Sequence, residues 1–428
     1  MGLWNKVVKF LRSNITVKIG DDDAAKWNAI FGGGSATLAG TKVDERAALN
    51  TTTVLACVRL LSGTIGSLPC VLYQKKGDKR VPAENHPLYS VLKNDATDET
   101  TAMAFFETTQ MHEELWGNRY AQILRKKSGA VYGLQLLMPD RTTVTRGADR
   151  RIKYTTTDSE GRQVTLDMDE VLHVPGLGFD GLVGKSPVGM MREAIGLAVA
   201  SEEFGARFFG NGATMSGYLK HPGQLTPEAL ERLKKQWQEN YTGPINAHKT
   251  VILEEAMDYQ AISMPLKDTQ FLEGRAFQAT EIASGFGVPP TMIGLQDKTT
   301  AWGSGIEQLM LGFLIFSLRP RMIRIEQAMT RKLLSEKEKK EFYIKFNANA
   351  LMRGDTKSRY EVYSIAKQNG ILSTNDIRAL EDLDPVESGD IYWRPANMAP
   401  ADAPYDPKAA AAAQNDLDKN QDKKGDKK

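Results

Sequence analysis

The stretch that decides the fold is residues 285–334, which read GFGVPPTMIGLQDKTTAWGSGIEQLMLGFLIFSLRPRMIRIEQAMTRKLL. A Gly/Pro-rich turn leads into a short polar loop at 296–304, and a helical pattern follows from Gly305 to Leu334. A helix of this length would be about 45 Å long, enough to cross a domain. Because Pro320 removes a backbone donor and clashes with the preceding turn, the sequence predicts a kink near this residue.

The two halves of this predicted helix differ in charge. Residues 309–318 carry no charged side chain, whereas the half beyond them is basic, with Arg319, Arg321, Arg324, Arg331 and Lys332. Three partners stay open for these cations: DNA phosphates, acidic groups of a neighbouring subunit, and the negative end of the helix macrodipole. A polar loop followed by a long, kinked, apolar helix indicates a segment that moves or that faces the lumen of a channel.

The composition is that of a globular protein with two or more domains or lobes. The chain has 428 residues, of which 41% are hydrophobic and 25% charged, and this length exceeds one ordinary core. Its net charge is only +2, whereas a protein that holds DNA tightly by its phosphates should be more basic. Any contact with nucleic acid is therefore expected to be local or weak.

Neither a metal site nor a membrane span is expected. Cys57 and Cys70 stand among apolar neighbours, as buried reduced thiols do, and the five histidines show no zinc-binding spacing. The N-terminus lacks a secretory signal, and the uncharged stretch near Pro320 is too short to cross a bilayer, so a soluble protein is expected. Apolar residues at helical spacing within 1–12 allow a membrane-surface helix, although an arm that docks on protein is the favoured interpretation.

Around the opening stretch, the hydrophobic pattern predicts an α+β lobe. Helices are expected at 51–67 and 101–115, and strands at 68–74, 119–125, 131–137, 142–145, 152–156, 163–166 and 171–174. Ser186 and Pro187 are typical of a helix start, and this helix should run to about Phe209.

A small αβ insert and a returning helix follow. The insert has predicted strands at 216–220, 250–254 and 259–263, and a helix capped by Thr226 whose apolar face comprises Leu230, Leu233, Trp237 and Tyr241. The returning helix is expected at 267–285, a strand at 342–346, and two short helices at 356–369 and 374–383. Residues 397–428 have low complexity and no periodic apolar face, which predicts disorder.

One glycine-rich loop offers an alternative function. Residues 176–181 read GLGFDG and are followed by Gly184, Lys185 and Ser186, so a nucleotide-dependent enzyme that uses 176–186 is conceivable. However, a phosphate loop needs glycine where Phe179 stands, and the helix starts too late for a dinucleotide fingerprint. A structural loop is favoured. Because no other catalytic motif is present, we predict no catalytic residue, no cofactor and no enzymatic activity.

Nine stretches, in order, resemble the portal (head–tail connector) proteins of long-tailed double-stranded-DNA bacteriophages, of the siphophage type. They are NTTTVLACVRLLSGTIGSLPCVLY, HPLYSVL, ELWGNRYAQILR, DGLVGKSPV, FFGNGATMSGYL, LEGRAFQATEIASGFGVPPTMIG, GIEQ, FNANALMRGDTKSR and NGILSTNDIR. The resemblance covers about residues 45–396. One departure is Trp302 with Gly303, where smaller polar residues are expected before GIEQ.

The resemblance implies the α+β portal fold, in which wing, stem, clip and crown regions surround a long kinked tunnel helix, and a ring, typically of twelve subunits. The implied regions are a flexible N-terminal arm at 1–45, a wing at 46–185, stem helices at 186–210 and 266–292, a clip at 211–265, a tunnel loop at 293–304, the tunnel helix at 305–335, a wing return strand at 336–352, crown helices at 353–396 and a disordered tail at 397–428.

The resemblance also implies the function and the site residues. The ring would be a DNA channel at the capsid vertex of the virion, made in the cytoplasm of the bacterial host. Its implied partners are double-stranded DNA bound without sequence preference, the large terminase, the major capsid and scaffold proteins and a head-completion adaptor. The implied site residues are Gln296, Asp297, Lys298, Thr299, Thr300 and Trp302 in the tunnel loop, Pro320, Arg319, Arg321 and Arg324 at the kink and basic face, and Leu230, Leu233, Trp237 and Tyr241 on the docking face of the clip.

Overall fold

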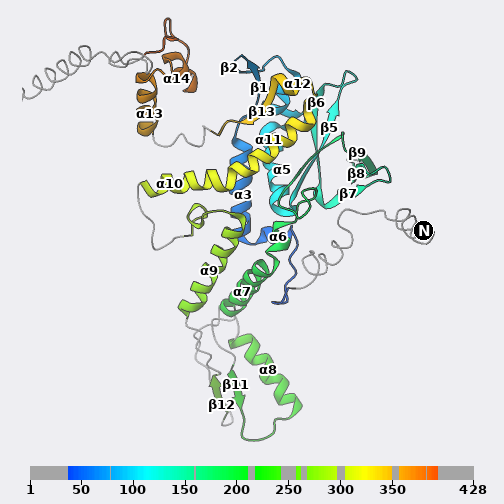
Figure 1. Cartoon of the computed structure of the whole chain (residues 1–428). Helices are drawn as coiled ribbons and strands as arrows, with labels where there is room; N and C mark the ends of the chain where they lie inside the picture. Colours follow the sequence, from blue (N-terminus) through cyan, green and yellow to red (C-terminus); the bar gives the residue numbers. More distant parts are fainter. Residues whose placement is uncertain are drawn as a thin grey trace, which may run out of the picture. The chain divides into compact units, whose positions relative to one another are not determined.

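The computed structural model describes most of the chain between Thr37 and Trp393 (Figure 1). The described residues are 37–77, 79–158, 161–210, 217–241, 257–261, 268–295, 304–348, 356–381 and 383–393. The polar loop with Gln296, Asp297, Lys298, Thr299, Thr300 and Trp302 therefore lies outside the described residues, as do residues 1–36 and the tail 397–428. The chain divides into two compact units, residues 1–348 and 349–428.

Two packed helices form the centre of the first unit. They are α3 (Thr52–Ser67) and α5 (Ala102–Trp116), and both lie close to their predicted ranges. Val54, Leu61 and Ile65 of α3 are fully buried, as the helical spacing predicts. At Gly66 an added Cβ would come within 2.8 Å of the Glu107 Cβ on α5, so this glycine permits the close approach of the helices.

The first unit also contains three antiparallel three-stranded sheets. Their strand orders are β13-β1-β2, β10-β5-β6 and β7-β8-β9. The strands are β1 (Cys70–Lys76), β2 (Lys79–Pro82), β5 (Asn118–Arg125), β6 (Val131–Leu137), β7 (Thr143–Arg146), β8 (Ile152–Thr157), β9 (Gln163–Asp167), β10 (Val171–Pro175) and β13 (Phe342–Phe346). Of the strands in these three sheets, all but β2 were predicted. Their pairing was not predicted, and in particular β13 returns from the far end of the unit to pair with β1.

Several short helices and strands were not predicted from the sequence. They are η1 (Ala47–Asn50), α4 (Pro87–Lys93), β3 (Asp95–Thr97), β4 (Thr100–Thr101), η2 (Pro139–Arg141), η4 (Pro290–Ile293) and α12 (Glu338–Glu341). Each has seven residues or fewer, which is too short for a hydrophobic period to be visible in the sequence.

The helix predicted from Pro187 to Phe209 is wrong in one respect, because the structure divides it. Ser186 caps α6 (Pro187–Met190), as expected, but Met191 leaves the helical path and α7 (Arg192–Gly210) begins after it. The Met191 side chain lies against Gly285 of α9 (Asp268–Phe286), where an added Cβ would be 2.0 Å from the methionine sulfur. Packing between α7 and α9, which lie side by side (Figure 1), thus accompanies the interruption.

The insert contains a two-stranded sheet and one helix. Strand β11 (Gly217–Lys220) pairs with β12 (Asp258–Ala261), and between them in sequence lies α8 (Pro227–Tyr241). Thr226 accepts a hydrogen bond from the Ala229 amide at the start of α8, which confirms the predicted cap. The strand predicted at 250–254 lies outside the described residues.

The long helix of the opening stretch has three parts. Helix α10 (Ser304–Phe313) continues into a π-helical segment, η5 (Leu314–Leu318), and then into α11 (Arg319–Leu333). Pro320 stands at the second position of α11, and the ribbon changes direction between α10 and α11 (Figure 1). Among the described residues, no helix has the length and apolar character needed to cross a membrane.

The second unit contains α13 (Thr356–Gln368) and α14 (Thr374–Leu380). A capping box begins α14, in which the Ser373 hydroxyl and the Asp376 carboxylate each accept from the other's backbone N–H. Tyr363 of α13 donates a hydrogen bond from its hydroxyl to Glu381, at 2.8 Å. This bond ties α13 to the residue that follows α14.

Candidate functional site

The most unusual arrangement in the first unit is a cluster of buried charged side chains beside the bend of the long helix. We call it the charged junction and define it as Gln110, Glu113, Glu114, Arg119, Arg321 and Arg324. Helix α5 supplies the two carboxylates and the amide, β5 supplies one arginine, and α11 supplies the other two. Three cations thus face two buried anions.

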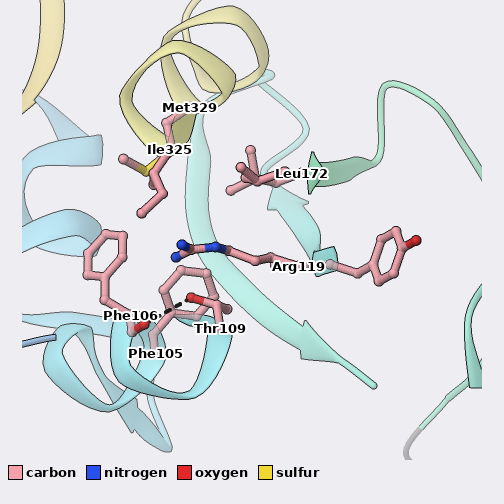
Figure 2. Close-up of a pocket in the computed structure, with 10 residues that line it drawn as sticks. Phe105, Phe106, Thr109, Arg119, Leu172, Ile325 and Met329 are labelled. Atoms are coloured by element: carbon pink, nitrogen blue, oxygen red, sulfur yellow. Dashed lines mark hydrogen bonds between the residues drawn. The ribbon is translucent and has the colours of Figure 1, made fainter. Parts of the chain in front are cut away.

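Arg119 is the most deeply buried member of the charged junction. Its Nε donates to Glu113 Oε2 at 2.6 Å, and its Nη2 contacts both Glu113 and Gln110. Its guanidinium lies in an apolar pocket lined by Phe105, Phe106, Leu172, Ile325 and Met329 (Figure 2). Burial lowers the pKa of Arg119, although the Glu113 carboxylate opposes this shift, and an arginine in contact with a carboxylate stays charged.

Arg321 connects three separate elements. Its Nε donates to Glu114 Oε1 at 2.6 Å and its Nη2 to Glu114 Oε2 at 3.0 Å, which is a two-pronged contact with α5. The same guanidinium donates to the carbonyl oxygens of Phe286, at the end of α9, and Ser317, in the π-helical segment, at 3.0 and 2.8 Å. Burial acts to lower the pKa of Arg321, but the Glu114 and Glu113 carboxylates together outweigh it and the pKa is raised.

Arg324 completes the charged junction. Its Nη1 donates to Glu113 Oε1 at 3.1 Å, and its side chain is 39% exposed. The structure therefore gives Arg321 and Arg324 acidic partners within the same chain, whereas the sequence left open DNA, a neighbouring subunit or the helix dipole. Arg319 and Pro320 are exposed.

The carboxylates of the charged junction were missed by the sequence analysis, although a signal was present. Phe106, Gln110 and Glu113 occur at helical spacing on α5, so polar residues continue the apolar face on which Phe106 is buried. A carboxylate in such a position requires a cationic partner, which predicts a buried ion pair but not which arginine provides it.

The upstream half of the long helix has an apolar surface that the described part of the chain does not cover. Its exposed residues are Leu309, Met310 and Leu311 of α10 and Ile315 and Phe316 of the π-helical segment, and Phe316 is 80% exposed. Three consecutive residues point in three directions around a helix, so the apolar surface is not confined to one stripe. Helices that are apolar all round are normally buried, and the described residues of this chain leave these side chains exposed.

The glycine-rich loop 176–186 is occupied by its own hydrogen bonds. The Gly184 N–H donates to Asn118 Oδ1 at 2.8 Å and the Gly176 N–H to the Gly117 carbonyl oxygen at 2.8 Å. The amides of Leu182 and Val183 both donate to Asp180. Since a phosphate needs free N–H donors and no adjacent carboxylate, this loop is unsuited to a nucleotide.

Close packing explains Gly178 and Gly184 of this loop. A Cβ on Gly184 would lie 1.9 Å from the Gly117 oxygen, and one on Gly178 would lie 2.2 Å from the Val183 oxygen. Lys185, the residue that a phosphate loop would aim at its ligand, extends its ammonium over the Phe179 ring at 5.7 Å. The structural interpretation of the loop therefore fits the geometry, and nothing in it favours the enzyme alternative.

Asn118 joins this loop to a buried histidine. Its Nδ2 donates to the Gly184 oxygen at 2.8 Å, so its Oδ1 is the acceptor for His173 Nε2 at 3.1 Å. His173 Nδ1 is then left to accept from the Tyr154 hydroxyl at 3.2 Å. This arrangement suits neutral His173, because burial lowers its pKa from 6.5 to about 3.

Stability is expected to fall in mild acid because of His173 and the buried His112, whose pKa burial lowers to about 4. Below pH 6.5 the unfolded chain binds protons that the folded chain excludes, so the free energy of unfolding decreases by roughly 1.4 kcal/mol per pH unit for each histidine, until the folded pKa is reached. Urea unfolding between pH 7.5 and 4.5 measures the slope. His173→Gln should reduce this slope by the contribution of one histidine. An unchanged slope in this variant would contradict the neutral, buried state assigned to His173.

The predicted clip face is described only in part. Leu230 is 44% exposed and Leu233 is half-buried, whereas the side chains of Trp237 and Tyr241 lie outside the described residues. Within the described residues, no group of three His, Cys, Asp or Glu side chains is arranged to hold a metal ion.

Comparison with known proteins gives consistent matches over most of the chain. A family model described as "Phage portal protein" matches residues 52–382. The "Probable portal protein" of Streptomyces phage phiC31 is 34% identical over 381 residues, which cover 86% of this chain and 83% of that protein. The "Portal protein" of Enterobacteria phage HK97 is 31% identical over 367 residues, which cover 85% of this chain and 86% of that protein.

A solved structure shares the fold. It belongs to the neck of an empty gene transfer agent (GTA) particle, computed with C6 symmetry, and it superimposes with a TM-score of 0.58 at 23% sequence identity. The similarity covers 85% of this chain and 100% of that chain.

Proposed function

The chain belongs to the phage portal protein family, and from this premise we propose that it forms a ring-shaped channel for double-stranded DNA at one vertex of the capsid. The single observation that carries the ring is the uncovered apolar surface of α10 and the π-helical segment, where Phe316 is 80% exposed. Another copy of the chain is the natural cover for it. The similar GTA neck structure has cyclic symmetry, and a ring of twelve subunits contains C6 symmetry.

We assign the regions of the portal fold as follows. The wing comprises 46–185 with the return strand at 336–352, the stem comprises 186–210 and 266–292, and the clip comprises 211–265. The tunnel loop is 293–304, the tunnel helix 305–335 and the crown 353–396. The packing of α7 on α9 supports their assignment as the paired stem helices, and the pairing of β13 with β1 supports the return to the wing.

The charge distribution suits a channel through which DNA slides. Each tight phosphate contact would have to be broken at every step of translocation, so strong binding would oppose movement. Arg321 and Arg324 are engaged by Glu114 and Glu113, which reduces the positive charge available to phosphates. With a net charge of +2, the chain is suited to weak contacts without sequence preference.

Partners follow from this role. The clip face around Leu230 and Leu233 would dock the large terminase during packaging and the head-completion adaptor afterwards, while the major capsid and scaffold proteins would contact the ring at the vertex. Terminase would supply the work of packaging, so the portal itself needs no nucleotide site. The protein would be made in the cytoplasm of the bacterial host and reside in the virion.

The ring is tested by native mass measurement and negative-stain electron microscopy of the purified protein. We expect particles with a central hole and a mass about twelve times that of one chain. Where purified protein stays monomeric, co-expression with the scaffold and capsid proteins is the second measurement. Monomers under both conditions would contradict the proposal.

Deleting residues 296–303 is expected to leave rings intact while reducing the number of DNA-filled capsids, because the loop would face DNA in the channel and not the neighbouring subunit. The measurement is the ratio of filled to empty particles when the variant complements a phage that lacks its portal gene. A loop of equal length made of Gly and Ser is the matched control for chain connectivity. Normal filling in both variants would refute the role of the loop.

A further inference from the structure

The long helix is held firmly on only one side of its bend. In α11 the buried residues are Met322, Ile325, Met329 and Leu333, whereas Phe313 is the one residue of α10 that is buried among those whose side chains the structure describes. Packing against the wing therefore determines the direction of α11 but contributes little to that of α10. Some other contact has to set the direction in which α10 leaves the bend.

The backbone at the bend departs from the α-helical pattern. Pro320 has no N–H to donate, and the preceding Arg319 N–H bonds to Leu314, five residues back, instead of four. A π-helical turn accommodates the extra residue and is a recognised cause of a change in helix direction. The backbone alone thus permits the bend without selecting its orientation.

Arg321 contacts three of the elements that meet at the bend. It donates to Glu114 of α5 through two nitrogens, to the Phe286 oxygen at the end of α9, and to the Ser317 oxygen inside the π-helical segment. Ser317 adds a second tie, because its hydroxyl donates to the Gly287 oxygen. The π-helical segment is thereby connected to both the wing helix and the end of the stem helix.

We propose that Arg321 is the positioning residue that sets the direction of α10 by fixing the π-helical segment to α5 and to the end of α9. The planar guanidinium reaches a carboxylate and two carbonyl oxygens at once, which a lysine ammonium on a flexible stem cannot reproduce. Only the consequence for DNA passage, namely that α10 delivers the tunnel loop to a defined place in the channel, rests on the proposed function.

Pulsed electron paramagnetic resonance on the full chain tests the proposal. Spin labels are attached to Gln135→Cys on β6 and Gln308→Cys on α10, both of which are exposed polar positions. The native Cys57 and Cys70 are buried, and burial raises the pKa of both thiols, that of Cys57 to about 12, so they should stay unlabelled. Labelled protein is diluted into unlabelled protein, so that each distance is measured within one chain.

The expected result is a narrow distance distribution in the parent and a broad or displaced one in Arg321→Gln, Arg321→Lys and Glu114→Gln. Met329→Ala is the matched control, because it removes a fully buried side chain of α11 and weakens the same helix without touching Arg321. Its distribution should stay narrow.

Two results would overturn the proposal. One is a parental distribution in the Arg321 and Glu114 variants, and the other is equal broadening in Met329→Ala, which would reduce Arg321 to a general stabiliser. Because Glu114→Gln preserves the shape of the side chain and an acceptor oxygen, it keeps the test decisive if the Arg321 variants do not fold. Neither result depends on DNA packaging, so the ring proposal stands or falls separately.

Discussion

Replacing Glu113 by alanine is expected to lower the free energy of unfolding by about 3–5 kcal/mol, the usual loss when one partner of a buried ion pair is removed. Arg119, whose side chain is 3% exposed, would keep its charge without a carboxylate, and Arg324 would lose the same partner. Urea unfolding followed by circular dichroism measures the change.

The matched control for Glu113→Ala is Glu336→Ala, which removes the same charge from an exposed pair with Lys339 at 2.6 Å. Little or no loss is expected there, because solvent already screens the pair. The double variant Glu113→Leu, Arg119→Met should recover much of the lost stability, since apolar replacement of a buried pair is often neutral or stabilising. Equal losses in Glu113→Ala and Glu336→Ala would contradict the burial of the charged junction.

The charged junction also shows where sequence-based prediction reaches its limit. The helical period predicted α3 and α5 closely, because each carries its own apolar face. The partner of Glu114 is Arg321, 207 residues further along the chain, and nothing local to either residue specifies the other. The same limit applies to β13 and β1, each of which was predicted as a strand without its partner.

An interruption of a helix was predicted only where the sequence contains a residue, such as proline, that breaks helices. Pro320 predicted a kink, although not the π-helical segment that precedes it. The break at Met191 had no such signal, because it accompanies contact with Gly285 on another helix. The tunnel loop and the apolar face of the clip helix remain predictions, since Trp302, Trp237 and their neighbours lie outside the described side chains.

The uncharged segment 309–318 is where the family resemblance and the physical argument about the long helix agree. The sequence showed that residues 309–318 carry no charge, which by itself fits a buried helix or a lumen-facing one. The structure adds that Leu309, Met310 and Leu311 are all exposed in a single chain. In the proposed ring, each copy would cover this surface on the next copy.

Phe316→Asp is therefore expected to abolish the ring while leaving the single chain folded. Because Phe316 is 80% exposed in the chain, the substitution should change the free energy of unfolding by no more than about 0.5 kcal/mol, as at most surface positions. In the interface, by contrast, an unpaired carboxylate would have to lose its water, and the loss of an aromatic hot-spot contact costs about 2 kcal/mol or more at each interface. Since every subunit of a closed ring has two neighbours, the penalty recurs around the whole ring.

Native mass spectrometry and light scattering measure the assembly of the Phe316→Asp variant. Phe316→Leu, which keeps an apolar side chain, is the matched control and should still form rings. Normal rings from Phe316→Asp would exclude Phe316 from the subunit interface, and a changed ratio of filled to empty capsids would then place it at the channel wall.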